Sequence, residues 1–255
     1  MRIGIIGGTG VYALGGSDAA TVRTRYGEAV LSRVPHGEHE LLFLARHGAG
    51  HSLPPHRINY RANIAALHDA GCRCIIATNA VGSIDESLEP GSLVLPDQFI
   101  DFTRARPLTF HDGEDGAVRH VDVTEPYCPA LRRRASESLA ALGLAVREGA
   151  TYVCTEGPRF ETPAEIRMFR LLGGDLVGMT GVPEVVLARE AGLCYMTLCI
   201  VTNFGAGISG RPLTEGEVGR IMDAAVGQVR EAIFAMTDSL GAGWDCRCAR
   251  PGNAD

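Results

Sequence analysis

Lysine is absent from this sequence, and all 24 basic residues are arginine. Two kinds of chemistry are therefore excluded, namely a lysine Schiff base and the phosphate-loop lysine of nucleotide-binding proteins. Any site for an anion must be built from arginine, histidine, hydroxyl groups and backbone N–H groups.

An excess of positive charge and a long apolar run are also missing. The net charge is −6, which argues against non-specific nucleic-acid binding, because that needs a basic surface. No apolar run approaches the ~20 residues of a membrane helix, so no membrane partner is expected. The start of the chain reaches glycine too soon to hold the apolar core of a signal peptide. We expect a cytoplasmic protein.

The eight cysteines are expected to be mostly small buried hydrophobes. Three of them lie in apolar runs: Cys154, Cys194 and Cys199. Two C-x-C pairs occur, at 72–74 and 246–248. Neither pair has the fourfold spacing of a zinc site, so no metal is predicted. A disulfide between Cys246 and Cys248 stays open, although disulfides are unusual in a reducing cytosol.

Strand-like and helical patterns alternate along the chain. The expected strands are Ile3–Ile6, Glu40–Leu44, Cys74–Thr78, Ser92–Leu95, Thr151–Cys154, Leu176–Gly178 and Leu193–Thr202. The expected helices are Asn59–Ala70, Cys128–Leu142, Pro163–Leu172, Val182–Gly192 and Thr214–Leu240. This alternation predicts an α/β fold with a mainly parallel mixed sheet flanked by helices. We expect one domain over 1–240, followed by a polar C-terminal tail over 241–255.

A glycine-rich turn, GGTG at 7–10, follows the first expected strand. Glycines let backbone N–H groups approach an anion, and Thr9 adds a hydroxyl donor. The same turn with Ala13 also fits the G-x-G-x-x-A pattern of dinucleotide sites. That interpretation needs an acidic residue about 20 positions on, at the end of a strand. Glu28 is near that distance but precedes the strand-like run Ala29–Val34, and no clear helix lies between, which weakens the dinucleotide interpretation. A tight turn without function stays open.

Arg46, His47 and His51 come directly after the second expected strand. The planar guanidinium of arginine can bind phosphate with two parallel hydrogen bonds, and histidine can donate as a cation or as a neutral tautomer. A single histidine is more often structural. Three donors within six positions at a strand end nevertheless favour an anion site.

Two further strand ends carry polar groups. Asn79 and Ala80 follow the third expected strand, and Met179 and Thr180 follow Leu176–Gly178. Simple turn chemistry is the alternative for both segments. They can join Arg46 in one site only if their strands are neighbours in the sheet, which a parallel sheet allows.

The stretch from Thr151 to Glu190 reads TYVCTEGPRFETPAEIRMFRLLGGDLVGMTGVPEVVLARE. It closely resembles the purine nucleoside phosphorylase and methylthioadenosine phosphorylase family, and the resemblance runs from Ile3 to about Val218. It implies the nucleoside phosphorylase fold, a nucleoside and inorganic phosphate as substrates, no cofactor, and a homotrimer or a dimer of trimers. It also implies roles in the phosphate site for the following residues: Thr9, Arg46, His47, Asn79, Ala80 and Thr180. Met179 matches a ribose contact.

Base selection is expected to depend on Glu161 and Asn203, with Phe160 stacking on the purine. An ionised carboxylate only accepts hydrogen bonds, so Glu161 matches the N1–H of a 6-oxopurine and the 2-amino group of guanine. Adenine-specific family members have two aspartates where this sequence has Asn203 and Gly205. Both differences favour hypoxanthine and guanine. A turn-capping role for Asn203 is the alternative.

The 5′ end of the ribose is less well defined. Glu215 falls where the family reads the 5′ substituent and would suit a 5′-hydroxyl, but it could equally be an acid in the first turn of a helix. His120 matches a position that approaches this pocket from a neighbouring subunit, with an exposed loop histidine as the alternative.

The predicted reaction is phosphorolysis of inosine and guanosine, with Asn203 as the catalytic residue that stabilises charge on the leaving purine. S-methyl-5′-thioinosine phosphorylase is the nearest alternative, and S-methyl-5′-thioadenosine phosphorylase is a weaker one. An NAD-binding oxidoreductase and a non-catalytic nucleoside-binding module remain as alternatives from other classes.

Overall fold

A mixed β-sheet runs through the computed structural model, which describes residues 1–8, 18–114, 116–241 and 243–249. Within these residues the sheet has 11 strands. The strands are β1 (Arg2–Gly7), β2 (Ala19–Thr24), β3 (Gly27–His36), β4 (His39–Ala45), β5 (Cys72–Ser83), β6 (Leu93–Leu95), β7 (Gln98–Phe102), β8 (Val146–Glu148), β9 (Thr151–Thr155), β10 (Leu176–Gly178) and β11 (Cys194–Phe204).

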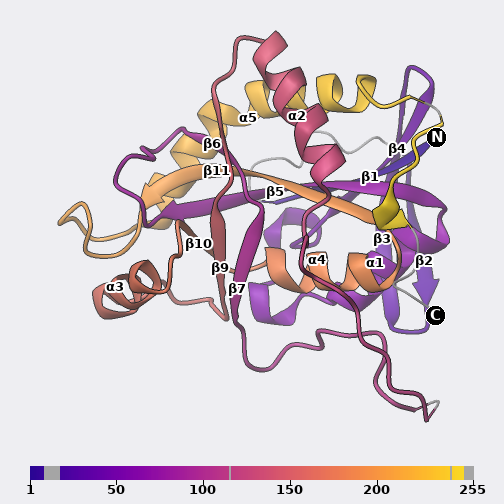
Figure 1. Cartoon of the computed structure of the whole chain (residues 1–255), viewed down its shortest axis with the longest axis horizontal. Coiled ribbons are helices and arrows are strands. Elements are labelled where there is room, and N and C mark those ends of the chain that lie inside the picture. The colour runs from indigo at the N-terminus through magenta and orange to yellow at the C-terminus, as the bar shows by residue number, and fades with distance from the viewer. Residues whose placement is uncertain (9–17, 115, 242, 250–255) are drawn as a thin grey trace.

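Helices cover both faces of this sheet, with α2 and α5 on one face and α1 and α4 on the other (Figure 1). The helices are α1 (Tyr60–Asp69), α2 (Pro129–Ala141), α3 (Pro163–Leu171), α4 (Gly181–Glu190) and α5 (Glu215–Asp238), with short 3₁₀ turns η2 (Ala49–His51), η3 (Pro55–Arg57) and η4 (Arg247–Ala249). The predicted α/β architecture with a mixed sheet is therefore confirmed. No helix among the described residues is long and apolar enough to span a membrane.

The expected elements are present, but the sheet is larger than the sequence predicts. Strand β2 and the short strands β7 and β8 were not among the expected strands, and β3 is longer than the strand-like run Ala29–Val34, so that it includes Glu28. In β2 no residue is buried, so the strand lacks the apolar pattern on which the prediction depends. It lies at one edge of the sheet, where it pairs only with β3 among the described strands. The long segment between β7 and α2 contains no helix or strand in its described part.

Strand β5 forms the centre of the sheet because its side chains are buried on both faces. Cys74 and Ile76 pack into the core under α2 and α5, whereas Ile75 and Ala77 pack into the core over α1 and α4. A strand covered on both faces has no polar side to alternate with, which explains the continuous apolar run CIIA at 74–77.

Parallel pairing brings several strand ends to one edge of the sheet. Strand β1 pairs in parallel with β4 and β5, and β5 pairs in parallel with β11 over ten register positions. Strand β10 runs antiparallel to β5, with Val177 opposite Gly82, so the chain leaving β10 returns along β5 toward Asn79. The residues that follow β1, β4 and β10, together with the end halves of β5 and β11, consequently lie close together.

Candidate active site

A cavity of about 620 Å³ lies at this edge of the sheet. It gathers nine of the residues that the sequence predicts for a functional site. Toward the ends of β4, β5 and β10 lie Arg46, His47, Ala80, Met179 and Thr180, and toward the loop after β9 and the end of β11 lie Phe160, Glu161, Asn203 and Gly205. Segments separated by up to 159 positions in the chain therefore meet in one space, as a parallel sheet allows.

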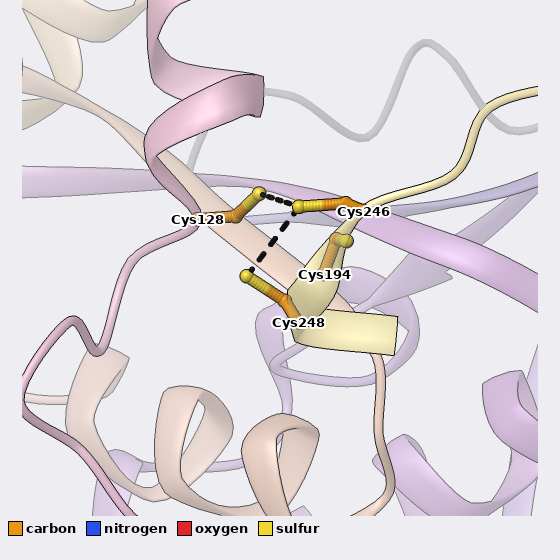
Figure 2. A group of neighbouring side chains, drawn as sticks. All are labelled: Cys128, Cys194, Cys246 and Cys248. Carbon is orange, nitrogen blue, oxygen red and sulfur yellow. Dashed lines mark hydrogen bonds between the residues drawn. The ribbon is translucent and has the colours of Figure 1, made fainter. Parts of the chain in front are cut away.

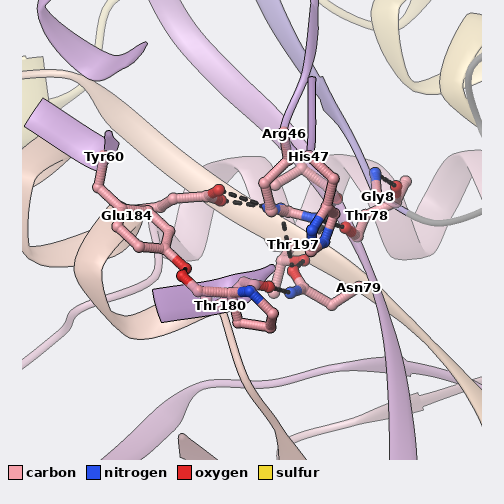
Figure 3. Close-up of polar contacts among 12 residues, drawn as sticks. Gly8, Arg46, His47, Tyr60, Thr78, Asn79, Thr180, Glu184 and Thr197 are labelled. Atoms are coloured by element: carbon pink, nitrogen blue, oxygen red, sulfur yellow. Dashed lines mark hydrogen bonds and ion pairs between the residues drawn. The ribbon is translucent and has the colours of Figure 1, made fainter. Parts of the chain in front are cut away.

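Arg46 forms the floor of the cavity and is only 1% exposed. Its Nε donates to Oε1 of Glu184 at 2.5 Å and its Nη2 donates to Oε2 at 2.8 Å, as Figure 3 shows. Nη1 donates to the carbonyl oxygen of Thr78 at 2.7 Å, and Nη2 also contacts Oδ1 of Asn79 at 3.4 Å. The two-bond contact that the sequence suggested for phosphate is thus made with Glu184, and a single N–H of Nη1 is left for a ligand.

The charge of Arg46 is fixed by this pairing. Burial alone would lower the pKa of its guanidinium, but the adjoining Glu184 carboxylate outweighs burial and raises that pKa above the ordinary value. Tyr195, in β11, donates its hydroxyl to Oε2 of Glu184 at 2.8 Å. At Gly8 an added Cβ would lie 2.7 Å from Nη1 of Arg46, so only glycine leaves room for the guanidinium at the end of β1.

Asn79 does not line the cavity itself but orients a residue that does. Its amide nitrogen donates to Oγ1 of Thr180 at 2.8 Å, and its Oδ1 accepts a hydrogen bond from Thr197 at 2.7 Å. Because the Thr180 oxygen accepts from Asn79, its own hydrogen is available to donate toward the cavity. Ala80, which the resemblance also assigns to the phosphate site, lies on the cavity wall.

His47 is held as a neutral acceptor. Its Nδ1 lies 2.8 Å from the carbonyl oxygen of Leu53, and a carbonyl only accepts, so Nδ1 carries the hydrogen. Burial, followed by the nearby charge of Arg46, lowers the pKa of His47 to about 4. The ring stacks on His51 with 4.3 Å between centroids. At neutral pH Nε2 therefore has a lone pair for a protonated oxygen, and the cationic alternative that the sequence left open is disfavoured.

Glu161 and Asn203 lie at the other end of the cavity, and both are nearly buried. Oε1 of Glu161 accepts from Thr155 at 2.6 Å, and burial raises the pKa of this carboxyl. Asn203 donates to the carbonyl oxygen of Phe204 at 2.9 Å and accepts from Thr202 at 2.8 Å. Each Asn203 amide atom keeps one further hydrogen-bonding position. Phe160 is 36% exposed at the rim.

Two residues that support the site were missed by the sequence prediction. Glu184 is the only acid in the otherwise apolar start of α4, GVPEVV, and a buried acid among apolar residues is a usable signal for a charge partner. Arg106 gives no such signal. It donates to the carbonyl oxygens of Met179 and Glu156, each at 2.5 Å, and thereby joins the two loops that follow β9 and β10.

Besides Asn79, three predicted residues are not placed in the cavity lining. Thr9 lies outside the described residues, and so does the side chain of Glu215, although helix α5 begins there. His120 lies exposed in the long loop and does not line the cavity of this chain.

Residues 2–237 match the family model described as the phosphorylase superfamily.

The chain belongs to the phosphorylase superfamily.

The predicted family membership is thus confirmed. A protein named 6-oxopurine nucleoside phosphorylase from Pyrococcus furiosus is 50% identical over 97% of this chain and 96% of its own length. A probable S-methyl-5′-thioinosine phosphorylase from Methanopyrus kandleri is 49% identical over 98% of this chain and 96% of its own. A methylthioadenosine phosphorylase from Schistosoma mansoni, solved with adenine, has a TM-score of 0.88 at 33% identity, with 93% and 91% of the two chains covered. The phosphorylase fold therefore extends over nearly the whole molecule.

The buried Arg46–Glu184 ion pair leads us to expect a large effect on stability when it is broken. Glu184→Gln leaves the charge of Arg46 buried without a counter-charge, and we expect a loss of about 3–5 kcal/mol of unfolding free energy. The control is Glu28→Gln, which breaks the exposed Arg23–Glu28 pair and should cost less than about 1 kcal/mol. Urea unfolding of both variants measures the difference. Equal, small losses of unfolding free energy in the two variants would show that the charge of Arg46 does not need Glu184 as its counter-charge.

The buried, neutral state of His47 should make the unfolding free energy depend on pH. Its folded pKa of about 4 lies below the ~6.5 of an unfolded histidine, so between these values only the unfolded chain takes up the proton. Stability should therefore fall as the pH decreases through this window, with a contribution of at most about 1.4 kcal/mol per pH unit from His47.

His47→Gln should flatten this dependence, whereas His68→Gln, at an exposed histidine of α1, should not. Urea midpoints at a series of pH values measure the slopes. Parallel slopes for the wild type and His47→Gln would contradict the buried, neutral assignment.

Proposed function

We propose that this chain catalyses the phosphorolysis of 6-oxopurine nucleosides, inosine and guanosine, to the free base and ribose 1-phosphate. The observation that carries the proposal is one cavity with Arg46, His47 and Thr180 at one end and Glu161 and Asn203 at the other. The first group suits an oxyanion, and the second suits a keto-purine. The relative from Pyrococcus furiosus bears the name of this activity.

Selection of the base follows from Glu161 and Asn203. An ionised Glu161 accepts from the purine N1–H, and the free hydrogen of the Asn203 amide donates to N7 or to the 6-oxo oxygen. Adenine presents a bare N1 that would face the carboxylate oxygen, and that repulsion disfavours it. Buried polar groups left without partners give strong discrimination, because each costs about 1–3 kcal/mol.

The reaction needs positioning rather than a protein nucleophile. A phosphate oxygen attacks the anomeric carbon while the bond from that carbon to N9 breaks, and the electron pair leaves with the purine. A hydrogen bond from Asn203 to N7 strengthens as negative charge grows there, so it stabilises the transition state more than the bound substrate. The free N–H of Arg46 and the hydroxyl of Thr180 hold the phosphate, and His47 accepts a hydrogen from it.

S-methyl-5′-thioinosine phosphorylase is the second candidate. Val218 and Gly219 of α5 line the cavity, and such small apolar groups would accommodate a methylthio substituent. The relative from Methanopyrus kandleri bears that name. A methylthioadenosine substrate is less compatible with Asn203 and Gly205, and an NAD-dependent oxidoreductase would have to bind nicotinamide dinucleotide, which a titration with NAD tests.

We also infer a homotrimer or a dimer of trimers, with His120 of one copy approaching the cavity of the next. The exposed position of His120 leaves it available for such a contact. The same proposal takes phosphate as co-substrate without a cofactor, places the enzyme in the cytoplasm, and makes the released base available for purine salvage.

One assay separates the candidates. Base release from inosine, guanosine, adenosine and S-methyl-5′-thioinosine is measured side by side, with and without phosphate. We expect phosphate-dependent release of hypoxanthine and guanine, and little or no release of adenine. Faster release from the methylthio substrate would favour the second candidate. Adenosine cleavage equal to that of inosine, or base release without phosphate, would contradict the proposal.

Replacement of Asn203 tests the mechanism. Asn203→Ala should lower kcat on inosine by about 10²–10³, as expected when one donor to a developing anion is lost, with the KM for phosphate nearly unchanged. Asn63→Ala, on α1 and outside the cavity lining, is the control. Wild-type kcat in Asn203→Ala would remove this residue from the mechanism.

A further inference from the structure

Four cysteines from three distant segments meet away from the cavity. Cys128 precedes α2, Cys194 begins β11, and Cys246 and Cys248 come from the polar tail. Figure 2 shows their side chains directed toward one another. All four sulfur atoms lie within 4.8 Å of one another. The sequence predicted no metal because neither C-x-C pair shows the spacing of a zinc site, but the fold supplies the two missing ligands from positions more than 50 residues upstream.

The spacing of the sulfur atoms suits a tetrahedral ion. Sγ of Cys246 lies 3.5 Å from Sγ of Cys128 and 3.7 Å from Sγ of Cys248. With a Zn–S bond of about 2.3 Å, tetrahedral geometry places neighbouring sulfur atoms about 3.8 Å apart. A disulfide would need a separation of about 2.05 Å. Tetrahedral coordination by four sulfur atoms is typical of zinc or iron–sulfur sites.

The surroundings of the cluster offer support for bound thiolates. Cys128 and Cys194 are almost completely buried, and Cys248 is 8% exposed. Trp244 packs against the core cluster that contains these three cysteines, and its buried indole N–H interacts with Cys194. The buried Nε of Arg189, a residue that acts electrostatically on Cys248, has no hydrogen-bond partner among the described residues. Hydrogen-bond donors around the sulfur atoms are what a negatively charged thiolate site requires.

We propose that Cys128, Cys194, Cys246 and Cys248 bind one Zn²⁺ ion as a closed structural site. Four protein ligands leave no position for water, so the ion is not catalytic. Cys194 and Asn203 stand at opposite ends of β11, about 30 Å apart at ~3.3 Å per residue. The ion would fasten the tail to the start of α2 and of β11 without touching the substrate cavity, so this proposal does not depend on the proposed function.

The test measures metal in the intact protein. Chain purified under reducing conditions is supplied with Zn²⁺, dialysed, and analysed for bound zinc, and Co²⁺ is then substituted to report geometry through its visible spectrum. We expect one zinc per chain and the intense bands of tetrahedral Co²⁺–thiolate.

Cys248→Ser and Cys246→Ser should each lower zinc affinity at least tenfold. Cys246 is only half-buried, so its variant is the one expected to tolerate replacement. Cys72→Ser, at a buried cysteine of β5 outside the cluster, should bind zinc normally.

Three results would overturn the proposal. The first is four freely titratable thiols with no retained metal after reconstitution. The second is a reduced, zinc-treated chain that reoxidises to a mass four hydrogens lower even in the presence of Zn²⁺, which would assign the cluster to two disulfides. The third is zinc binding that persists unchanged in both Cys246→Ser and Cys248→Ser, which would place the ion elsewhere.

Discussion

The buried ion pair between Arg46 and Glu184 is the interaction on which the rest of the site depends. Both side chains are 1% exposed, so each charge has lost its hydration and is compensated almost entirely by the other and by neighbouring hydrogen bonds. Burying such a pair brings little net stability. We infer that the pair acts mainly by fixing the place of the Arg46 guanidinium. The pair connects the end of β4 to α4, and Tyr195 extends the connection to β11. It fixes one remaining N–H of Arg46 at the cavity floor.

The hydrogen bonds that surround this pair prepare the cavity before a substrate arrives. Asn79 links the guanidinium to Thr180, and Leu53 fixes the tautomer of His47. The phosphate end is thereby built from directed donors and one acceptor rather than from loose positive charge, which agrees with a sequence that has no lysine. Groups already oriented toward a developing charge need little reorganisation during the reaction, and this is where much of enzymatic rate enhancement arises.

Much of the fold and part of the site could be predicted from the sequence, because β5 and β11 have continuous apolar runs and Arg46 and Asn203 occur at strand ends. The residues that hold these site residues in place could not be predicted. Glu184 lies 138 positions from Arg46, and only the folded sheet brings them together. Arg106 acts through backbone carbonyl groups, which leave no trace in a residue pattern. The edge strand β2 lacks buried positions, and the four-cysteine cluster joins segments that local spacing cannot relate.

A crystal structure of the enzyme with phosphate and hypoxanthine bound together would test the central claim most directly. The account predicts phosphate within hydrogen-bond distance of Nη1 of Arg46, Nε2 of His47 and Oγ1 of Thr180, with the Arg46–Glu184 pair intact. It predicts the base against Glu161 and Asn203. Phosphate bound away from Arg46, or a base that contacts neither Glu161 nor Asn203, would contradict it.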